Sequence, residues 1–443
     1  MAASSRSSFL IKILLCVSLL LCLNEKACVV HGADEITLPV SSLFPSPDCK
    51  ASTTNANSTL KLVHKHGPCS PLFIGEPVNH TQLLLEDIVR AKWIRSKSSG
   101  TNTANGLKDS AVSIKAKYGP GGGSYLVTPC VVSCYSQDEA IFDPSQSSSY
   151  ANISCSSLSC SQLGSGTGQR PRCSDSTCVY KAQYGDRESF TVGFFATETL
   201  TLSPTDAISG FEFGCGQNNG GRFKGFAGLL GLARDRISIL EQSATKYGRS
   251  FSYCLPPSTS STGYLTFGKG SVVSTSVSFT PLSTVSQGAI FYGIDITGIS
   301  VGGKPLSIPS TVFSNAGTII DSGTTITQLP PTAYGALRSA FRQAMSKYKM
   351  ATPASPLDTC YDFSGSTTVT IPVITFSFRG PINVDLDPSG VLFPINPSKV
   401  CLAFAASGDD TYLSIYGNIQ QRSFEVVYDV AGGQIGFGAK GCS

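Results

Sequence analysis

The chain has 443 residues, of which 41% are apolar and 14% are charged, and its formal net charge is +4. The length and apolar content suffice for two or three globular domains. The positive charge is not concentrated in a long basic block, so nucleic-acid binding has no support. Abundant Ser and Thr, with 44 Gly and 25 Pro, favour short strands joined by turns. We therefore expect a mainly β protein.

Residues 1–33 have the pattern of a secretory signal peptide. Arg6 and Lys12 precede a nearly uninterrupted apolar run from Ile13 to Leu23, which is too short to span a bilayer. Small residues at Gly32 and Ala33 suit cleavage by a signal peptidase. Once this segment is removed, we expect no membrane association.

Residues 34–116 have the polar character of a prosegment. They contain glycosylation sequons at Asn57 and Asn79. Residues 82–93 have an apolar face that predicts a helix, and the Ser/Thr/Asn/Gly-rich run 96–105 predicts a cleavable linker. The pattern indicates a glycosylated zymogen.

From residue 117 onward, short strand patterns such as 196–202 and 291–297 alternate with turns. One strong helix is predicted over 332–347, with Pro331 suited to its first turn. A weak internal repeat relates 227–232 to 414–419, each with two apolar residues and a Gly where backbones approach closely. The repeat predicts two lobes, 117–288 and 289–443.

The clearest chemical feature is the run from Thr318 to Thr325, an apolar strand that leads into Asp321 on a Gly turn. All four histidines precede residue 81, so the region after the prosegment has no imidazole for Ser-His-Asp or Cys-His hydrolysis, nor for a His-based zinc site. No phosphate-binding or dinucleotide glycine motif is present. If the chain is an enzyme, carboxyl groups must carry the chemistry. A pair of carboxyl groups of the glycosidase type is one alternative, because the spacing of such a pair is spatial.

The cysteines predict a disulfide framework, because an exported chain matures in an oxidising compartment. Their spacing is irregular, which argues against a metal cluster. Downstream of residue 115 their number is odd, so one partner is missing. These are Cys130, Cys134, Cys155, Cys160, Cys173, Cys178, Cys215, Cys254, Cys360, Cys401 and Cys442.

The sequence resembles the pepsin-like aspartic endopeptidases of plants, in particular the nepenthesin-like group. The resemblance rests on Asp321-Ser322-Gly323-Thr324-Thr325, the glycine-centred repeats, Tyr184-Gly185-Asp186, the prosegment string 63–72 and the cysteine-rich insert 130–178. It implies a bilobal pepsin-like acid protease fold, hydrolysis of protein or peptide substrates at acidic pH, a monomer, and no cofactor or metal. It also implies secretion to the extracellular or cell wall space, with the vacuole or plastid as alternatives.

The same resemblance implies a role for each site residue. Asp321 would be the catalytic carboxylate of the second lobe, and Ser322 and Thr324 would form hydrogen bonds around the dyad. Gly323 would let substrate backbone approach, and Tyr184 would close over the bound peptide. The implied disulfides are Cys134–Cys215, Cys155–Cys178, Cys160–Cys173, Cys254–Cys442 and Cys360–Cys401, with Cys130 left as a free thiol.

The first catalytic motif of this family, Asp-Thr-Gly-Ser followed by Trp and Cys, has no counterpart here. It would stand between Thr128 and Pro129, which are adjacent in this chain. The odd cysteine and the placement of the only Trp, Trp93, in the prosegment both agree with a deletion. Two or three strands with their turns come to about 25 residues, the scale of a skipped exon or a faulty gene model. We expect a truncated first lobe.

Because the chemistry needs two facing carboxylates that share one proton, the chain as written is expected to be impaired. Asp321 stands between an apolar strand and a Gly turn, and Asp138, Asp143 and Asp186 do not. None of them is therefore a convincing substitute for the missing catalytic Asp. Two alternatives remain open. One is a non-catalytic peptide- or inhibitor-binding pseudopeptidase, and the other is a symmetric dimer that pairs two copies of Asp321.

Overall fold

The computed structural model describes residues 34–50, 59–64, 67–70, 79–98, 111–112, 142–184, 189–221, 228–268, 276–283, 291–315, 317–380 and 382–442. Strands dominate these residues, so the expectation of a mainly β protein is confirmed. The signal segment, the Thr128–Pro129 junction, Asp138 and Asp186 lie outside the described residues. Within the described part of the chain, no helix is long and apolar enough to cross a membrane.

The strands before residue 290 are β1 (Glu35–Pro39), β2 (Thr59–Val63), β3 (Ala111–Val112), β4 (Ala151–Asn152), β5 (Arg172–Ser174), β6 (Thr177–Tyr184), β7 (Ser189–Ser203), β8 (Asp206–Gly220), β9 (Leu230–Gly231), β10 (Ser250–Cys254), β11 (Thr262–Phe267) and β12 (Val277–Pro281). The helices in this half are η1 (Val40–Leu43), α2 (His80–Ser98), η2 (Pro144–Gln146), α3 (Leu158–Thr167), α4 (Ile239–Gln242) and α5 (Ala244–Tyr247).

The later strands are β13 (Tyr292–Ile294), β14 (Ile296–Val301), β15 (Lys304–Pro305), β16 (Thr318–Ile320), β17 (Thr327–Leu329), β18 (Met350–Ala351), β19 (Cys360–Asp362), β20 (Thr368–Pro372), β21 (Ile374–Phe378), β22 (Ile382–Asp385), β23 (Leu392–Asn396), β24 (Lys399–Leu402), β25 (Phe404–Ala406), β26 (Ser414–Tyr416), β27 (Glu425–Asp429) and β28 (Gln434–Gly438). The helices here are α6 (Thr311–Ser314), α7 (Pro331–Ala344), α8 (Pro388–Val391) and η4 (Ile419–Gln421).

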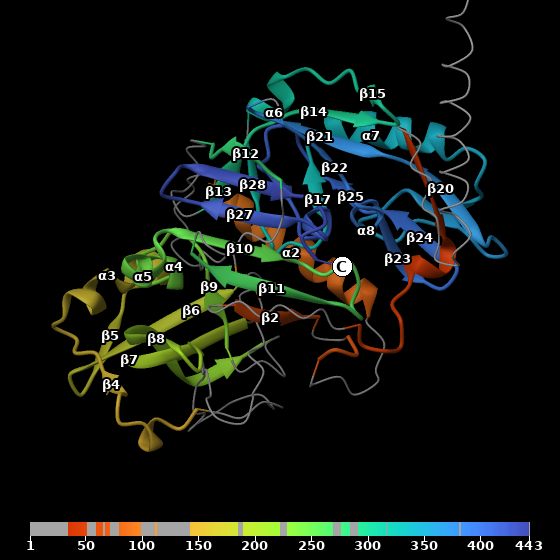
Figure 1. Cartoon of the computed structure of the whole chain (residues 1–443). Coiled ribbons are helices and arrows are strands. Elements are labelled where there is room, and N and C mark those ends of the chain that lie inside the picture. The colour runs from red at the N-terminus through yellow and green to blue at the C-terminus, as the bar shows by residue number, and fades with distance from the viewer. Residues whose placement is uncertain are drawn as a thin grey trace, which may run out of the picture.

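A six-stranded sheet, ordered β12-β28-β27-β10-β11-β2, joins distant parts of the chain. Its strands come from the N-terminal region, the middle and the C-terminus, and all its pairs are antiparallel. Figure 1 shows this sheet crossing the middle of the molecule, between the yellow-green strands β4 to β8 and the blue strands of the second half. The N-terminal region is therefore part of the sheet system, with β1 also paired along β20.

The second half carries the sheet that positions Asp321. Its order is β13-β16-β26-β17-β25, in which β16 pairs antiparallel with β13 and parallel with β26. Parallel neighbours are usually covered on both faces, and all three residues of β16 are accordingly buried. In the first half, the long strands β7 and β8 pair with β6, β5 and β4 in an antiparallel sheet.

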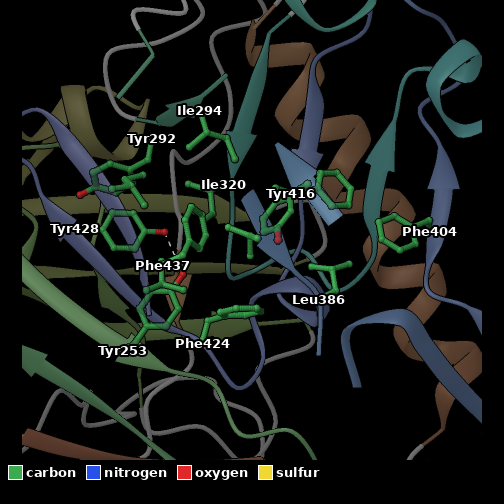
Figure 2. Packing of buried hydrophobic residues seen from close by; sticks show 14 of the residues in the cluster. Tyr253, Tyr292, Ile294, Ile320, Leu386, Phe404, Tyr416, Phe424, Tyr428 and Phe437 are labelled. Carbon is green, nitrogen blue, oxygen red and sulfur yellow. Dashed lines mark hydrogen bonds between the residues drawn. The ribbon is translucent and has the colours of Figure 1, made fainter. Parts of the chain in front are cut away.

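The main apolar core lies beside the end of β16. Figure 2 shows Ile320 of β16 among Tyr416, Phe437 and the facing pair Tyr253 and Tyr428, whose hydroxyls are 3.0 Å apart. These rings are almost fully buried. The strand that leads to Asp321 is therefore held in a rigid aromatic environment.

Several predicted elements are confirmed. The helix predicted over 332–347 is α7, with Tyr334, Leu337, Phe341 and Met345 buried on one face, although it ends at Ala344. Residues 196–202 lie within β7, whereas 291–297 divides into β13 and β14. The helix predicted over 82–93 is α2, which continues to Ser98 and thus into the predicted linker. Tertiary contacts of Ile94, which is fully buried, extend it.

The disulfide predictions are partly wrong. Cys254–Cys442 and Cys360–Cys401 are confirmed. In the cysteine-rich insert the bonds are Cys155–Cys173 and Cys160–Cys178, not the predicted Cys155–Cys178 and Cys160–Cys173. The fold buries Cys160 of α3 together with Cys178 of β6 and leaves Cys155 and Cys173 more exposed.

The predicted Cys134–Cys215 bond is also wrong. Cys215 is a buried free thiol in the described part of the chain, and Cys130 and Cys134 lie outside it. Cys49 and Cys69 of the N-terminal region are bonded to each other.

Candidate functional site

Asp321 stands directly after β16, at the point where the strand leaves the sheet. Its backbone N–H donates to the carbonyl of Tyr416 on the parallel neighbour β26, at 3.0 Å. The loop that follows folds back through a bond from Thr324 N to the Asp321 carbonyl, and Asn418 N donates to the Thr324 carbonyl. The carboxyl group is only 1% exposed, so its position is fixed by the sheet and by this loop.

Within the described residues, three groups donate hydrogen bonds to the Asp321 carboxylate. Arg90 of α2 binds it in a bidentate manner, with Nε to Oδ2 and Nη2 to Oδ1 both at 2.9 Å. Thr324 Oγ1 donates to Oδ2 at 2.5 Å, and Gly323 N donates to Oδ1 at 3.1 Å. Burial alone would raise the pKa of Asp321, but the charge and hydrogen bonds of Arg90 outweigh it and lower the pKa below its usual value. The group is a paired, ionised carboxylate.

A second carboxyl group, that of Asp87, lies against the same loop. It is one helical turn before Arg90 on α2 and accepts hydrogen bonds from the backbone N–H groups of Thr325 and Ile326. Burial raises the pKa of Asp87 to about 7, although both backbone donors and Arg90 act in the opposite direction. α2 therefore contacts the Asp321 loop through a guanidinium and a carboxyl group whose proton is retained up to about pH 7.

These two carboxyl groups should give the stability of the chain opposite pH dependences. Since the pKa of Asp87 is raised in the folded chain, Asp87 contributes fully to the free energy of unfolding below its pKa in the unfolded chain, about 3.9. This contribution is lost as the pH rises through about 7. The contribution of Asp321 is present above about pH 3.9 and is lost as the pH falls through its lowered pKa. The urea midpoint should fall between about pH 4 and 7 in the native chain and less steeply in Asp87→Asn. Parallel curves for Asp87→Asn and the native chain would contradict this assignment.

The two glycines of the internal repeat differ in their surroundings. A Cβ on Gly417 would lie 2.8 Å from backbone atoms of Thr325 and Ile326, so this glycine lets β26 pack directly on the Asp321 loop. A Cβ on Gly231 would meet none of the described residues within 4 Å. The predicted close approach of two backbone segments is confirmed at Gly417. At Gly231, no described residue lies close enough to contact an added Cβ.

This difference predicts unequal costs for the same substitution. Gly417→Ala should lower the free energy of unfolding by about 1–3 kcal/mol, because rigid backbone must move. Gly231→Ala should change it by less than about 0.5 kcal/mol, as expected for a site without close neighbours. Urea unfolding of the two variants checks this, and an equal cost at both sites would show that a loop also packs on Gly231.

The structure places the other predicted site residues as follows. Thr324 donates to the Asp321 carboxylate, and the Ser322 carbonyl accepts from Asn418 Nδ2 at 3.2 Å. The space over Gly323 is taken by Arg90, whose Nη2 would lie 2.4 Å from an added Cβ. Tyr184 ends β6, where its backbone pairs with Ser189.

Asp143 is not a substitute partner for Asp321. It is exposed and caps η2, where its carboxylate accepts from the backbone N–H and the hydroxyl of Ser145. In addition, no cluster of three or more His, Cys, Asp or Glu that suits a metal ion occurs within the described residues.

Sequence reasoning missed Asp87 and Arg90 as partners of the Asp321 loop. The only available signal was their position, three residues apart on the apolar side of a predicted helix. Such charges are usually solvated, so this pattern did not reveal which surface they would meet.

Comparison with known proteins agrees with this geometry. The family models described as xylanase inhibitor N-terminal and C-terminal match residues 121–269 and 291–439. An aspartyl protease family protein of Arabidopsis thaliana is 46% identical over 476 residues, covering 99% of both chains. Aspartic proteinase nepenthesin-2 of Nepenthes gracilis is 35% identical over 339 residues, covering 74% of each chain.

Solved structures support the fold. The crystal structure of edgp aligns with a TM-score of 0.57 at 23% identity, over 72% of this chain and 86% of that chain. Basic 7S globulin from soybean aligns with a TM-score of 0.55 at 21% identity, over 69% of this chain and 84% of that chain. Together with the sequence relatives, these matches show that the chain belongs to the plant pepsin-like aspartic peptidase family and has its bilobal, mainly β fold.

Proposed function

We propose that this chain is a secreted aspartic-type endopeptidase by descent whose hydrolysis of peptide bonds is impaired, because Asp321 has no carboxylate partner. The observation that carries the proposal is that the Asp-Thr-Gly-Ser motif of the family has no counterpart between Thr128 and Pro129, which are adjacent in this chain. In an active dyad, one ionised and one protonated carboxyl hold a water between them that attacks the peptide carbonyl. In the uncut chain the Arg90 guanidinium also stabilises the ionised form of Asp321, through two hydrogen bonds of 2.9 Å.

The comparison with the relatives supports a missing segment. The match to the Arabidopsis relative extends over 476 aligned positions and includes 99% of the 443 residues of this chain, which is about 439 residues. About 37 aligned positions therefore contain a gap in this chain. This difference in length supports the proposed truncation of the first lobe.

The proposed organisation follows the sequence boundaries. It comprises a signal peptide over 1–33, a prosegment over 34–116, a first lobe over 117–288 with Tyr184 as its flap residue, and a second lobe over 289–443. A glycosylated chain, secreted to the extracellular or cell wall space, is part of the proposal. A dimer that pairs two copies of Asp321 is disfavoured, because a second chain would have to displace Arg90 from a carboxylate that is 1% exposed.

A hydrolysis assay at acidic pH tests the proposed impairment. The purified chain and Asp321→Asn should cleave an unfolded protein substrate at the same background rate, because a lone carboxylate cannot supply both acid and base. Cleavage that is abolished by Asp321→Asn would overturn the proposal.

A non-catalytic peptide-binding role is the second candidate. It is favoured by the contact of Asp321 itself, which binds a cationic side chain through two parallel hydrogen bonds, a geometry suited to recognition. A pepstatin-like peptide should then bind the chain without being cut, as measured by calorimetry. Absence of binding in a folded sample would remove this role.

A further inference from the structure

A third sequon for N-linked glycosylation, Asn152-Ile153-Ser154, lies in the first half of the chain. Asn152 ends β4, and among the described strands β4 stands at one end of the sheet ordered β4-β7-β6-β5. The other two sequons are those of Asn57 and Asn79. Since a sequon by itself is a weak signal, the surroundings of its side chains decide whether the fold can accommodate a carbohydrate.

The middle residue of this sequon fixes the direction of the two polar side chains. Ile153 is 8% exposed and packs in a cluster with Cys178 and Phe195. Its N–H donates to the Phe195 carbonyl at 2.9 Å, and its carbonyl accepts from Cys178 N at 2.8 Å. Successive side chains of an extended segment point to opposite sides, so Asn152 and Ser154 lie on the solvent side, where both are exposed.

The amide of Asn152 has one oxygen in use and one nitrogen available. The Tyr150 hydroxyl donates to Asn152 Oδ1 at 2.7 Å. Within the part of the chain that the structure describes, Nδ2 of Asn152 donates to no acceptor. A glycosylated amide keeps its carbonyl oxygen as an acceptor. A carbohydrate on Nδ2 would therefore break no contact between described residues.

The position of β4 leaves room for a bulky group. Figure 1 shows β4 at the outer margin of the yellow-green strands, on the side away from the blue strands of the second half. Asn79 has a different role, because its Oδ1 accepts from Gln82 N at 3.0 Å at the start of α2. Asn152 thus offers a carbohydrate site on the first half that is separate from both α2 and the Asp321 loop.

We propose that Asn152 carries an N-linked oligosaccharide. The donor is an oligosaccharide attached to a lipid pyrophosphate. A bond forms between Asn152 Nδ2 and the anomeric carbon of the sugar, and the bond from that carbon to the pyrophosphate breaks. The amide loses one proton, and the lipid pyrophosphate is the leaving group. This inference rests on the proposed secretion, because the donor is met in the secretory pathway, and it adds the modified residue.

The test is expression of the full chain in plant cells and its purification from both the cells and the medium. Digestion with a peptide-N-glycosidase in heavy-oxygen water releases the oligosaccharide and converts the modified Asn into an aspartate that carries the heavy oxygen. Peptide mass spectrometry then assigns this label to a residue. We expect the label at Asn152.

Two results would overturn the inference, and they differ in what they say about secretion. A label at Asn79 or Asn57 without one at Asn152 would overturn the inference alone, because the chain has then met the donor. Absence of the label from all three sequons would overturn both the inference and the proposed passage through the secretory pathway.

Ser154 and Ser156 provide a matched control. Their exposed hydroxyl groups are hydrogen-bonded to each other at 3.0 Å, so Ser154→Ala and Ser156→Ala both remove this contact. Only Ser154→Ala destroys the sequon, and it should increase the gel mobility by the mass of one oligosaccharide, as should Asn152→Gln. Ser156→Ala and Ser154→Thr should keep the native mobility. Equal mobility of Ser154→Ala and the native chain would contradict a glycan at this residue.

Discussion

Arg90→Met is expected to lower the free energy of unfolding by about 3–5 kcal/mol near neutral pH, because it leaves a buried charge without its partner. Asp321 is 2% exposed at its side chain, so water cannot replace the two lost guanidinium bonds. Urea unfolding followed by Trp93 emission measures the change.

Two comparisons isolate the ion pair from general effects on the helix. Lys92→Met removes the same charge from an exposed position of α2 and should cost less than about 0.5 kcal/mol. The double variant Arg90→Met with Asp321→Asn should recover much of the loss, because the unpaired charge is then absent. Additive costs of the two single substitutions would show that the pair is not energetically coupled.

Restoration of peptide hydrolysis is the second large expected effect. Insertion of a family segment bearing Asp-Thr-Gly-Ser between Thr128 and Pro129 should raise the rate of acid hydrolysis by at least about 100-fold over the native chain, since general acid–base catalysis then becomes available. The assay belongs at acidic pH, where protonation of Asp321 weakens its pairing with Arg90.

The inserted chain carries its own controls. Replacing the inserted Asp by Asn, or Asp321 by Asn, should return the rate to background, because each carboxyl group is required. No gain on insertion into a folded chain would mean that the missing motif is not what limits this protein.

The sequence alone was sufficient to locate the second-lobe half-site and the family. An apolar strand that ends in Asp-Ser-Gly is a local pattern, as is the amphipathic helix α7, whose apolar face is buried. The prediction that Gly417 allows close backbone contact was likewise local, because only glycine tolerates backbone within 3 Å of its Cβ position.

Pairing across the chain required the tertiary structure. The sequence left two pairing schemes for the insert cysteines, and the shared burial of Cys160 on α3 and Cys178 on β6 agrees with the pair that the structure forms. The surroundings of Gly231 also required the tertiary structure. The internal repeat predicted that another backbone segment lies close to this glycine, but none of the described residues does.

The sequence by itself determined that Asp321 stands between an apolar strand and a Gly turn, because strand, carboxylate and turn are contiguous. Only the tertiary structure decided what Asp321 binds. Arg90 is 231 residues away in the chain, and its charge gave no sign of its partner. Contacts at that separation depend on how β16, β26 and α2 pack together, which no local pattern of residues encodes.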